Sequence, residues 1–331
     1  MAGVHGLKYI ALGITTYCSH CCGICYETAG LKPKDRRNGD LKTLMHIGDK
    51  LLKAGVEFVE LVGGDPNEHP EIGKLTRYLH DLGLEVGILS NTHCAWREVA
   101  AYVTALEWTV HGPQNFHDAY TRPGTYNEVL GRLKEFAKVK TKDQKIGLTL
   151  NFTPIMSVKL YETVCALANE LPVNYIQLQR VGPFGGAKGG DYSLKLEEVI
   201  AIYRQIQKVD EELGLEIEVV DSYPMCLLPE DLRKYTARCD WGFGTGYVNM
   251  CGDLSRCAVN QIYNIGNILV PETPLEWLWE HDAGLRRFRE KRYLPLRCQE
   301  CDLLEKCGGG CPSSCGGCEL SVDQLIAERE D

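Results

Sequence analysis

Short apolar segments alternate with helical patterns over the first two thirds of the chain, and this alternation constrains the fold more than any other feature. Strands are expected at 9–15, 58–64, 85–91, 107–112, 145–152 and 175–181. Helices are expected near 41–54, 71–82, 96–105, 126–139, 158–170 and 194–213. Repeated strand–helix units favour parallel strands joined by right-handed crossovers. Six units predict an α/β fold, a partial (β/α)6 barrel rather than a complete eightfold one.

The alternation stops near Pro224, and the remaining chain is rich in glycine and cysteine. A segment without repeated apolar strands has little hydrophobic core, so metal ligation would supply the missing free energy of folding. We therefore place a domain boundary at about residue 222. Residues 1–222 are expected to form the barrel domain, and residues 223–331 a cysteine-rich domain.

Composition disfavours several partners. The formal net charge is −9, whereas phosphate binding needs a basic face, so no nucleic-acid partner is expected. No apolar run reaches the roughly 18–20 residues that span a bilayer, and the N-terminus has no signal pattern, so no membrane partner is expected. We expect a cytoplasmic protein, whose 16 cysteines serve metal binding or catalysis rather than structural disulfides.

Four cysteines lie directly after the first expected strand, in the stretch "TTYCSHCCGICYE". Loops at the carboxyl ends of parallel strands are where α/β folds place active sites. Cys18, Cys22 and Cys25 give a C-x3-C-x2-C pattern, and adding Cys21 gives two adjacent C-x2-C pairs for zinc or iron–sulfur. Four thiolates would close the site, whereas three on a 4Fe–4S cluster leave one iron open.

The C-x3-C-x2-C pattern after a first strand resembles the signature of the radical S-adenosylmethionine (SAM) enzymes. The resemblance extends to the ends of the next four strands, and it implies SAM contacts from Gly63, Gly64, Asp65, Ser90, Asn91, Thr109 and Asn151. Three positions depart from the family pattern. Asp65 stands for glutamate, His111 for aspartate, and Ile24 for an aromatic residue.

The resemblance also implies the chemistry. Cys18, Cys22 and Cys25 would hold a 4Fe–4S cluster, with Cys21 as an extra thiol. The open iron would bind SAM, and one electron from a donor such as flavodoxin or ferredoxin would cleave it to methionine and a 5′-deoxyadenosyl radical. That radical would abstract hydrogen from a substrate C–H bond, while the protein excludes competing hydrogen donors.

The last third of the chain carries a second cysteine pattern, which resembles the SPASM extension of radical SAM enzymes. It reads Cys298-x2-Cys301-x5-Cys307-x3-Cys311, preceded by Cys239-x12-Gly252-x4-Cys257. A zinc ribbon would need two C-x2-C pairs some 15–20 residues apart, and only one such pair stands here.

By that resemblance two auxiliary 4Fe–4S clusters form, which makes three clusters in all. The first would use Cys239, Cys257 and Cys311, with Cys226 preferred as fourth ligand and Cys251 as competitor. The second would use Cys298, Cys301 and Cys307, completed by Cys318 or Cys315.

Some residues are candidates for contact with substrate. His111, His117, Asp118 and Tyr120 follow the fourth expected strand, where acid–base groups can reach a substrate, although a capping or loop role would explain each of them too. Cys251, if not a ligand, is a candidate hydrogen-atom donor of the kind used by radical SAM epimerases. The glycine-rich segment 182–191 is expected to form a loop over the site.

Three functions stay open at this point. We expect a radical SAM oxidoreductase or epimerase for a small natural-product or carbohydrate-type substrate, because only 17 residues precede Cys18 and leave no room there for a peptide-recognition domain. The alternative is oxidation or crosslinking of a ribosomal peptide or protein side chain. The second alternative, an iron–sulfur electron-transfer protein, would not cleave SAM.

Overall fold

One ten-stranded sheet organises the computed structural model, which describes residues 6–20, 22–27, 33–90, 96–182, 185–187, 194–259, 263–291 and 293–312. The strand order is β10-β9-β8-β1-β2-β3-β4-β5-β6-β7. The strands are β1 (Tyr9–Thr15), β2 (Phe58–Gly63), β3 (Glu85–Ser90), β4 (Ala105–Val110), β5 (Lys145–Phe152), β6 (Tyr175–Arg180), β7 (Ile217–Val219), β8 (Thr245–Val248), β9 (Asp253–Ser255) and β10 (Asn264–Asn267).

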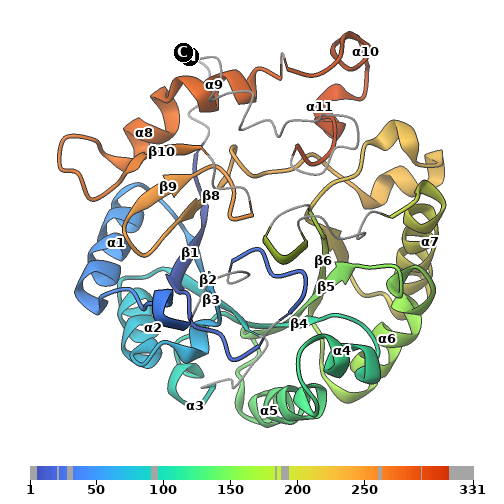
Figure 1. Cartoon of the computed structure of the whole chain (residues 1–331), viewed down its shortest axis with the longest axis horizontal. Coiled ribbons are helices and arrows are strands. Elements are labelled where there is room, and N and C mark those ends of the chain that lie inside the picture. The colour runs from blue at the N-terminus through green and yellow to red at the C-terminus, as the bar shows by residue number, and fades with distance from the viewer. Residues whose placement is uncertain are drawn as a thin grey trace.

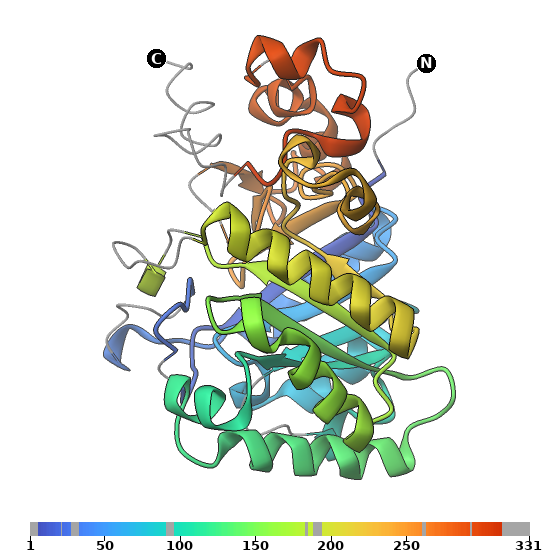
Figure 2. The ribbon, with the colours of Figure 1, turned by 90° about the vertical axis from the view of Figure 1, so that its right-hand side faces the viewer.

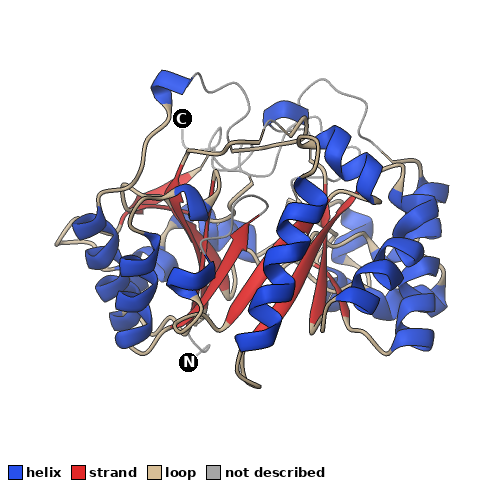
Figure 3. Ribbon diagram, turned by 90° about the horizontal axis from the view of Figure 1, so that it is seen from below, coloured by secondary structure: helices blue, strands red, loops and turns tan. Residues whose placement is uncertain are grey.

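Helices surround this sheet on its outer face (Figures 1 and 3). The α-helices are α1 (Leu41–Lys53), α2 (Ile72–Asp81), α3 (Trp96–Val99), α4 (Gln114–Tyr120), α5 (Thr125–Val139), α6 (Met156–Glu170), α7 (Leu196–Leu213), α8 (Leu275–His281), α9 (Ala283–Arg289), α10 (Leu296–Gln299) and α11 (Leu304–Cys307). Short 3₁₀ turns are η1 (Pro33–Asp35), η2 (Pro66–Glu68), η3 (Gly185–Ala187), η4 (Met225–Leu227) and η5 (Glu230–Tyr235).

The first helix shows how the sequence pattern produces these elements. Asp40 begins α1 by accepting a hydrogen bond from the backbone N–H of Thr43 at 3.0 Å. Leu44, Ile47 and Leu51 recur at helical spacing and are fully buried. Helical periodicity therefore lays one apolar stripe of α1 against the sheet.

The six strands expected from the sequence form in the expected order, and strands β1 to β7 pair in parallel. The α/β class and the barrel-type sheet are thus confirmed. The largest difference is α3, which ends at Val99 rather than near 105. The chain turns there because β4 begins at Ala105, where it pairs with β3 and β5.

The sheet extends beyond the six expected units on both sides. β7 pairs with β6, and the later segment adds β8, β9 and β10 next to β1. β8 pairs in parallel with β1 from Tyr9↔Thr245 to Leu12↔Val248, so one sheet includes strands from both sides of residue 222. The sequence analysis did not predict these strands, because each has only three or four residues.

The cysteine-bearing helices of the C-terminal segment lie at one end of the molecule, beyond the edge of the barrel (Figure 2). The described part of that segment contains α8 to α11 and the β8–β9–β10 strands. Among the described residues, none of the helices combines the length and the apolar character needed to cross a bilayer.

Candidate active site

The chain leading into the first cysteine group is held against the end of β2. The N–H of Gly64 donates to the carbonyl of Thr15 at 2.7 Å, and that of Asp65 to the carbonyl of Tyr17 at 2.6 Å. A Cβ on Gly63 would stand 2.3 Å from the Thr15 oxygen, and one on Gly64 2.0 Å from the Tyr17 oxygen. The sequence analysis linked these glycines to SAM, and the structure shows that the backbone of this loop also requires them.

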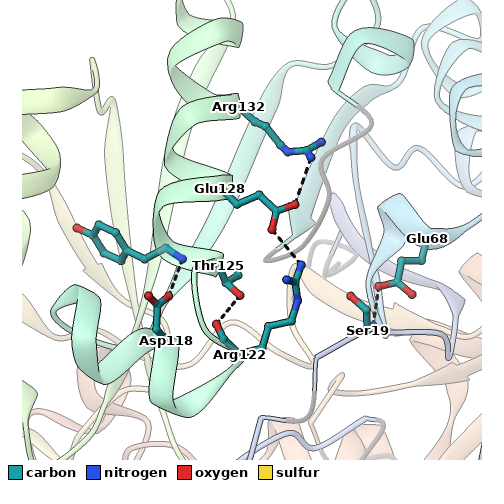
Figure 4. A network of polar contacts seen from close by, with 8 residues as sticks. Ser19, Glu68, Asp118, Arg122, Thr125, Glu128 and Arg132 are labelled. Carbon is teal, nitrogen blue, oxygen red and sulfur yellow. Dashed lines mark hydrogen bonds and ion pairs between the residues drawn. The ribbon is translucent and has the colours of Figure 1, made fainter.

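Three further contacts fix this loop. Glu68 of η2 accepts a hydrogen bond from the N–H of Ser19 (Figure 4). The Arg36 guanidinium donates to the carbonyl of Cys18 at 2.7 Å. Gly186 donates its N–H to the carbonyl of Cys25 at 2.8 Å, which brings η3, in the loop after β6, against the cysteine loop.

The three expected ligands of the first cluster lie on this anchored loop. Cys18 is buried, while Cys22 and Cys25 are half-buried and joined by a turn in which the N–H of Cys25 donates to the carbonyl of Cys22 at 3.1 Å. Burial and the nearby charge of Asp65 raise the pKa of the Cys18 thiol. A thiolate at that position therefore needs a bound cation, and the iron of a cluster fits this requirement. Cys21 lies outside the described residues.

No three Cys, His, Asp or Glu side chains within the described ranges converge on a point suited to a single metal ion. A 4Fe–4S cluster makes a different demand, because each of its cysteines bonds a different iron. A loop that spreads Cys18, Cys22 and Cys25 over eight residues is compatible with that demand.

Asp65 and Ser90 meet at the ends of β2 and β3. The Ser90 hydroxyl lies 2.9 and 2.8 Å from the two Asp65 carboxylate oxygens. Asp65 is fully buried and also accepts from the N–H of Asn67 at 2.9 Å, which caps η2. The two expected SAM contacts are thus adjacent. Asn91, the next expected contact, lies outside the described residues.

A second polar group forms at the ends of β4 and β5. His111 Nδ1 lies 3.1 Å from Asn151 Oδ1, and the His111 ring stacks on His117 with 5.4 Å between ring centroids. Burial lowers the pKa of His111 to about 4 and that of His117 to about 3. Both imidazoles are therefore neutral at neutral pH. Thr109, half-buried, belongs to the same strand end.

Asp118 and Tyr120, the other two acid–base candidates, make different contacts. Asp118 accepts from the N–H of Tyr126 at 2.8 Å and so caps the first turn of α5 (Figure 4). The Tyr120 ring lies 5.0 Å from the His111 ring. The His117 ring packs edge-on against the Trp108 ring, with 5.5 Å between the ring centroids. The structure therefore gives Asp118 and His117 contacts typical of capping and packing, and leaves His111 and Tyr120 together.

Sequence reasoning missed a buried carboxyl pair inside the barrel. Glu60 of β2 and Glu107 of β4 are both buried, and the Tyr175 hydroxyl donates to Glu107 at 2.6 Å. Burial raises the pKa of both carboxyls. The available signal was one glutamate in the middle of each of two otherwise apolar strands.

Glu60 also lines a cavity of about 800 Å³ between β6–β7 and the β1–β8 side. The other walls include Tyr9, Gln177 and Glu218. None of the described residues expected to bind SAM, metal or substrate lines this cavity.

Three C-terminal cysteines are expected to hold the first auxiliary cluster. Cys239, Cys257 and Cys311 are buried. Burial, followed by the charges of Cys311 and Cys257, raises the pKa of the Cys239 thiol. The Cys311 sulfur lies 3.9 Å from an oxygen of Asp221, a residue that the sequence analysis did not consider.

A second group contains Cys298, Cys301 and Cys307. Cys226, the preferred fourth ligand of the first cluster, is exposed, and its neighbour in the chain contacts this second group. The N–H of its neighbour Met225 donates to the Cys307 sulfur at 3.3 Å. Burial and then the charge of Cys226 raise the pKa of the Cys298 thiol.

The other three cysteine candidates stand apart from these groups or lie outside the described residues. Cys251 is exposed in the turn between β8 and β9, where its N–H donates to the Asn249 side chain at 2.9 Å. Cys315 and Cys318 lie outside the described residues.

A partial barrel with a three-cysteine loop after β1 and further cysteine groups in a C-terminal segment defines the radical SAM class with auxiliary clusters. The comparisons agree. The model of the Radical SAM superfamily matches residues 12–171, and that of the SPASM iron–sulfur cluster-binding domain matches residues 239–302. The chain belongs to the radical SAM superfamily and carries a C-terminal SPASM domain.

Individual relatives match most of the chain. A PqqA peptide cyclase of Ruegeria pomeroyi is 24% identical over 309 residues, covering 90% of this chain and 80% of the relative. An AdoMet-dependent heme synthase of Methanosarcina barkeri is 23% identical over 330 residues, covering 91% of this chain and 88% of the relative.

Among solved structures, SuiB of Streptococcus suis bound to S-adenosylmethionine has a TM-score of 0.74 at 17% identity, with 95% of this chain and 78% of that chain covered. SuiB bound to its precursor peptide SuiA has a TM-score of 0.70, also at 17% identity, with 93% of this chain and 72% of that chain covered. These structures show that the fold is shared.

Proposed function

We propose that this radical SAM enzyme modifies a side chain of a short ribosomal peptide. The observation that carries the proposal is the match to a PqqA peptide cyclase over 90% of the chain. It is supported by the fold shared with SuiB, which has been solved with a precursor peptide. This reading takes the place of the small natural-product or carbohydrate substrate expected from the sequence.

The geometry supports an assignment of the residues that would hold the cofactors. Cys18, Cys22 and Cys25 would bind the SAM-dependent cluster, and the Asp65–Ser90 pair stands next to their loop as the candidate SAM contact. When bound, SAM and a reduced cluster supply a 5′-deoxyadenosyl radical able to abstract hydrogen from carbon. The two C-terminal cysteine groups would hold two auxiliary clusters, for three in total.

The role of His111 follows from its charge state. Burial lowers its pKa to about 4, so its imidazole is neutral when it contacts Asn151. A neutral imidazole in contact with an amide orients a neighbouring polar group by hydrogen bonding, and it carries no positive charge. We assign His111 and Asn151 to positioning the substrate at the ends of β4 and β5.

The test is an anaerobic assay of the cluster-loaded enzyme with SAM, a strong reductant and short peptides encoded beside the gene. We expect 5′-deoxyadenosine, and a peptide that has lost two hydrogens by mass spectrometry. Cys22→Ala should abolish both signals, while Cys165→Ala, which changes a cysteine outside the three groups, should preserve them. SAM cleavage without change in any peptide would contradict the peptide assignment.

The second candidate is radical oxidation of a small molecule. The specific observation in its favour is the AdoMet-dependent heme synthase relative, whose own length is covered to 88%. The same assay distinguishes the two candidates, because a small-molecule enzyme would increase 5′-deoxyadenosine with a tetrapyrrole and not with a peptide.

A further inference from the structure

The first auxiliary cysteine group has a carboxylate beside it. Asp221 follows β7, and its Oδ1 lies 3.9 Å from the Cys311 sulfur. The backbone runs alongside as well, because the N–H of Cys311 donates to the carbonyl of Ser222 at 2.8 Å. The backbone bond therefore holds Cys311 beside the residue that follows Asp221.

The other carboxylate oxygen of Asp221 is already engaged. The N–H of Arg180, at the end of β6, donates to Oδ2 at 2.9 Å. This bond fixes the carboxylate plane and leaves Oδ1 directed at the sulfur of Cys311.

Loading the site with iron changes the chemistry of this contact. In the structure the Cys311 thiol can donate a proton to Asp221, but as a cluster ligand Cys311 would be a thiolate with no proton to donate. Two anions would then face each other in a buried place, which is costly unless positive charge neutralises both. In a 4Fe–4S cluster each ligand bonds a different iron, so one iron would bind Cys311 and the fourth would be free for Asp221, and carboxylate oxygen is an accepted iron ligand in proteins.

We propose that Asp221 is the fourth ligand of the first auxiliary 4Fe–4S cluster, together with Cys239, Cys257 and Cys311. The inference rests on the cluster content in the proposed function, but not on the identity of the substrate. It also releases Cys226 from this cluster, consistent with the contact of its neighbour Met225 with the Cys307 sulfur.

The segment between Asp221 and Cys226 supports the assignment of these two residues to different cysteine groups. The segment from Asp221 to Cys226 runs along the 307–311 loop, with Ser222 bonded to Cys311 and Met225 to Cys307. A Cβ on Gly310 would meet Pro224 at 2.7 Å, so the two backbones are in close contact between those bonds. One end of the segment therefore reaches the first cysteine group, and the other end reaches the second.

The test uses a Cys18/Cys22/Cys25→Ala background, so that only auxiliary clusters are measured. The parent protein, with Asp221 in place, should contain about 8 irons per chain. The Asp221→Ala protein should either contain about 4 fewer irons or keep a cluster with one open iron. In the latter case imidazole or cyanide should change the EPR spectrum of Asp221→Ala and leave that of the parent unchanged. Asp221→Cys should restore full iron content with a lower reduction potential.

Glu218→Gln, which removes a charge three residues earlier on β7, is the matched control and should leave iron content and EPR unchanged. Circular dichroism separates misfolding from ligand loss, and Asp221→Cys keeps the test valid if Asp221→Ala does not fold. An Asp221→Ala protein with parent iron content, parent EPR and no response to imidazole or cyanide would overturn the proposal. Iron absent from all variants would instead refute the cluster assignment in the proposed function.

Cys226→Ser and Cys251→Ser complete the experiment. Cys226→Ser should alter the EPR spectrum of the second auxiliary cluster only, whereas Cys251→Ser should alter neither. Loss of the first cluster in Cys226→Ser would return Cys226 to the first cluster and contradict the role of Asp221.

Discussion

Buried polar residues at the strand ends and inside the barrel set the chemistry at the scale of single residues. His111 and His117 are neutral because burial penalises their charged forms, and Glu60 and Glu107 hold their protons more tightly for the same reason. A sequence position alone does not reveal such shifts, because they depend on which strands surround the side chain.

Glu107 gives a pH prediction. Its pKa is raised in the folded chain, so the folded state binds more protons than the unfolded state, and stability falls as pH rises above the ordinary range of glutamate. Glu107→Gln keeps an acceptor for Tyr175 and removes the titration. At pH 8 it should raise stability by about 1 kcal/mol, or about 2–4 °C in Tm, with a smaller gain at pH 6.

Thermal unfolding of the cluster-loaded protein at several pH values measures this effect. Glu85→Gln, an exposed glutamate at the start of β3, is the control and should give no such pH-dependent gain. A Glu107→Gln curve parallel to that of the wild type at all pH values would contradict the prediction.

Gly64 gives a second prediction at this scale. A Cβ there would stand 2.0 Å from a backbone oxygen, and backbone cannot move aside as a flexible side chain can. Gly64→Ala should therefore destabilise the protein by about 1–3 kcal/mol and lower the iron retained by the Cys18 loop. Gly131→Ala in α5 meets nothing within 4 Å and should be neutral or stabilising. Equal behaviour of the two variants would be evidence against the close approach of β2 to this loop.

Short C-terminal strands complete the sheet at the scale of elements. β8 has only four residues, yet it pairs with β1 and inserts Tyr247 next to Gly13. A Cβ on Gly13 would stand 2.3 Å from the Tyr247 hydroxyl oxygen. Tyr247 pairs with Ala11, and its side chain reaches Gly13 two residues further along β1, so this packing depends on a residue without a side chain at position 13.

A double-mutant cycle tests this docking. Gly13→Ala alone should destabilise the protein because of the clash, and Tyr247→Ala alone because of the lost packing. The double variant should cost about 0.5–3 kcal/mol less than the sum of the two, since the new methyl group then has room. Additive costs in denaturant unfolding would show that the two residues are not in contact.

At the scale of the whole molecule, we propose that hydrophobic packing stabilises the barrel and that metal ligation stabilises the C-terminal cysteine segment. The barrel has a continuous apolar core between strands β1–β7 and their helices. Residues 293–312 contribute mainly short helices and cysteines, so we propose that clusters stabilise this part. The boundary near residue 222 remains a proposal, because the sheet itself continues through β8.

Anaerobic chelation of iron tests this division. Amides in 293–312 should lose hydrogen-exchange protection by at least about tenfold, whereas amides in β3, β4 and β5 should stay protected, because their stability comes from packing. Uniform loss of protection over the whole chain would show that the barrel also depends on the clusters.

The sequence predicted the parts of this protein that local patterns encode. Apolar strands and amphipathic helices of adequate length identify themselves by periodicity, which is why β1 to β6 and α5 to α7 appear close to their expected positions. The spacing of Cys18, Cys22 and Cys25, and of the cysteines from 298 to 311, was likewise enough to identify the family that the comparisons show.

By itself, then, the sequence determined the α/β barrel and the family, because these depend on residues near one another in the chain. Only the tertiary structure decided that Met225 contacts Cys307, that Asp221 faces Cys311, that Asp65 meets Ser90, and that β8 docks on β1. The physical reason is that each of these contacts joins residues 25 to more than 200 positions apart, and their distance is set by how the elements pack.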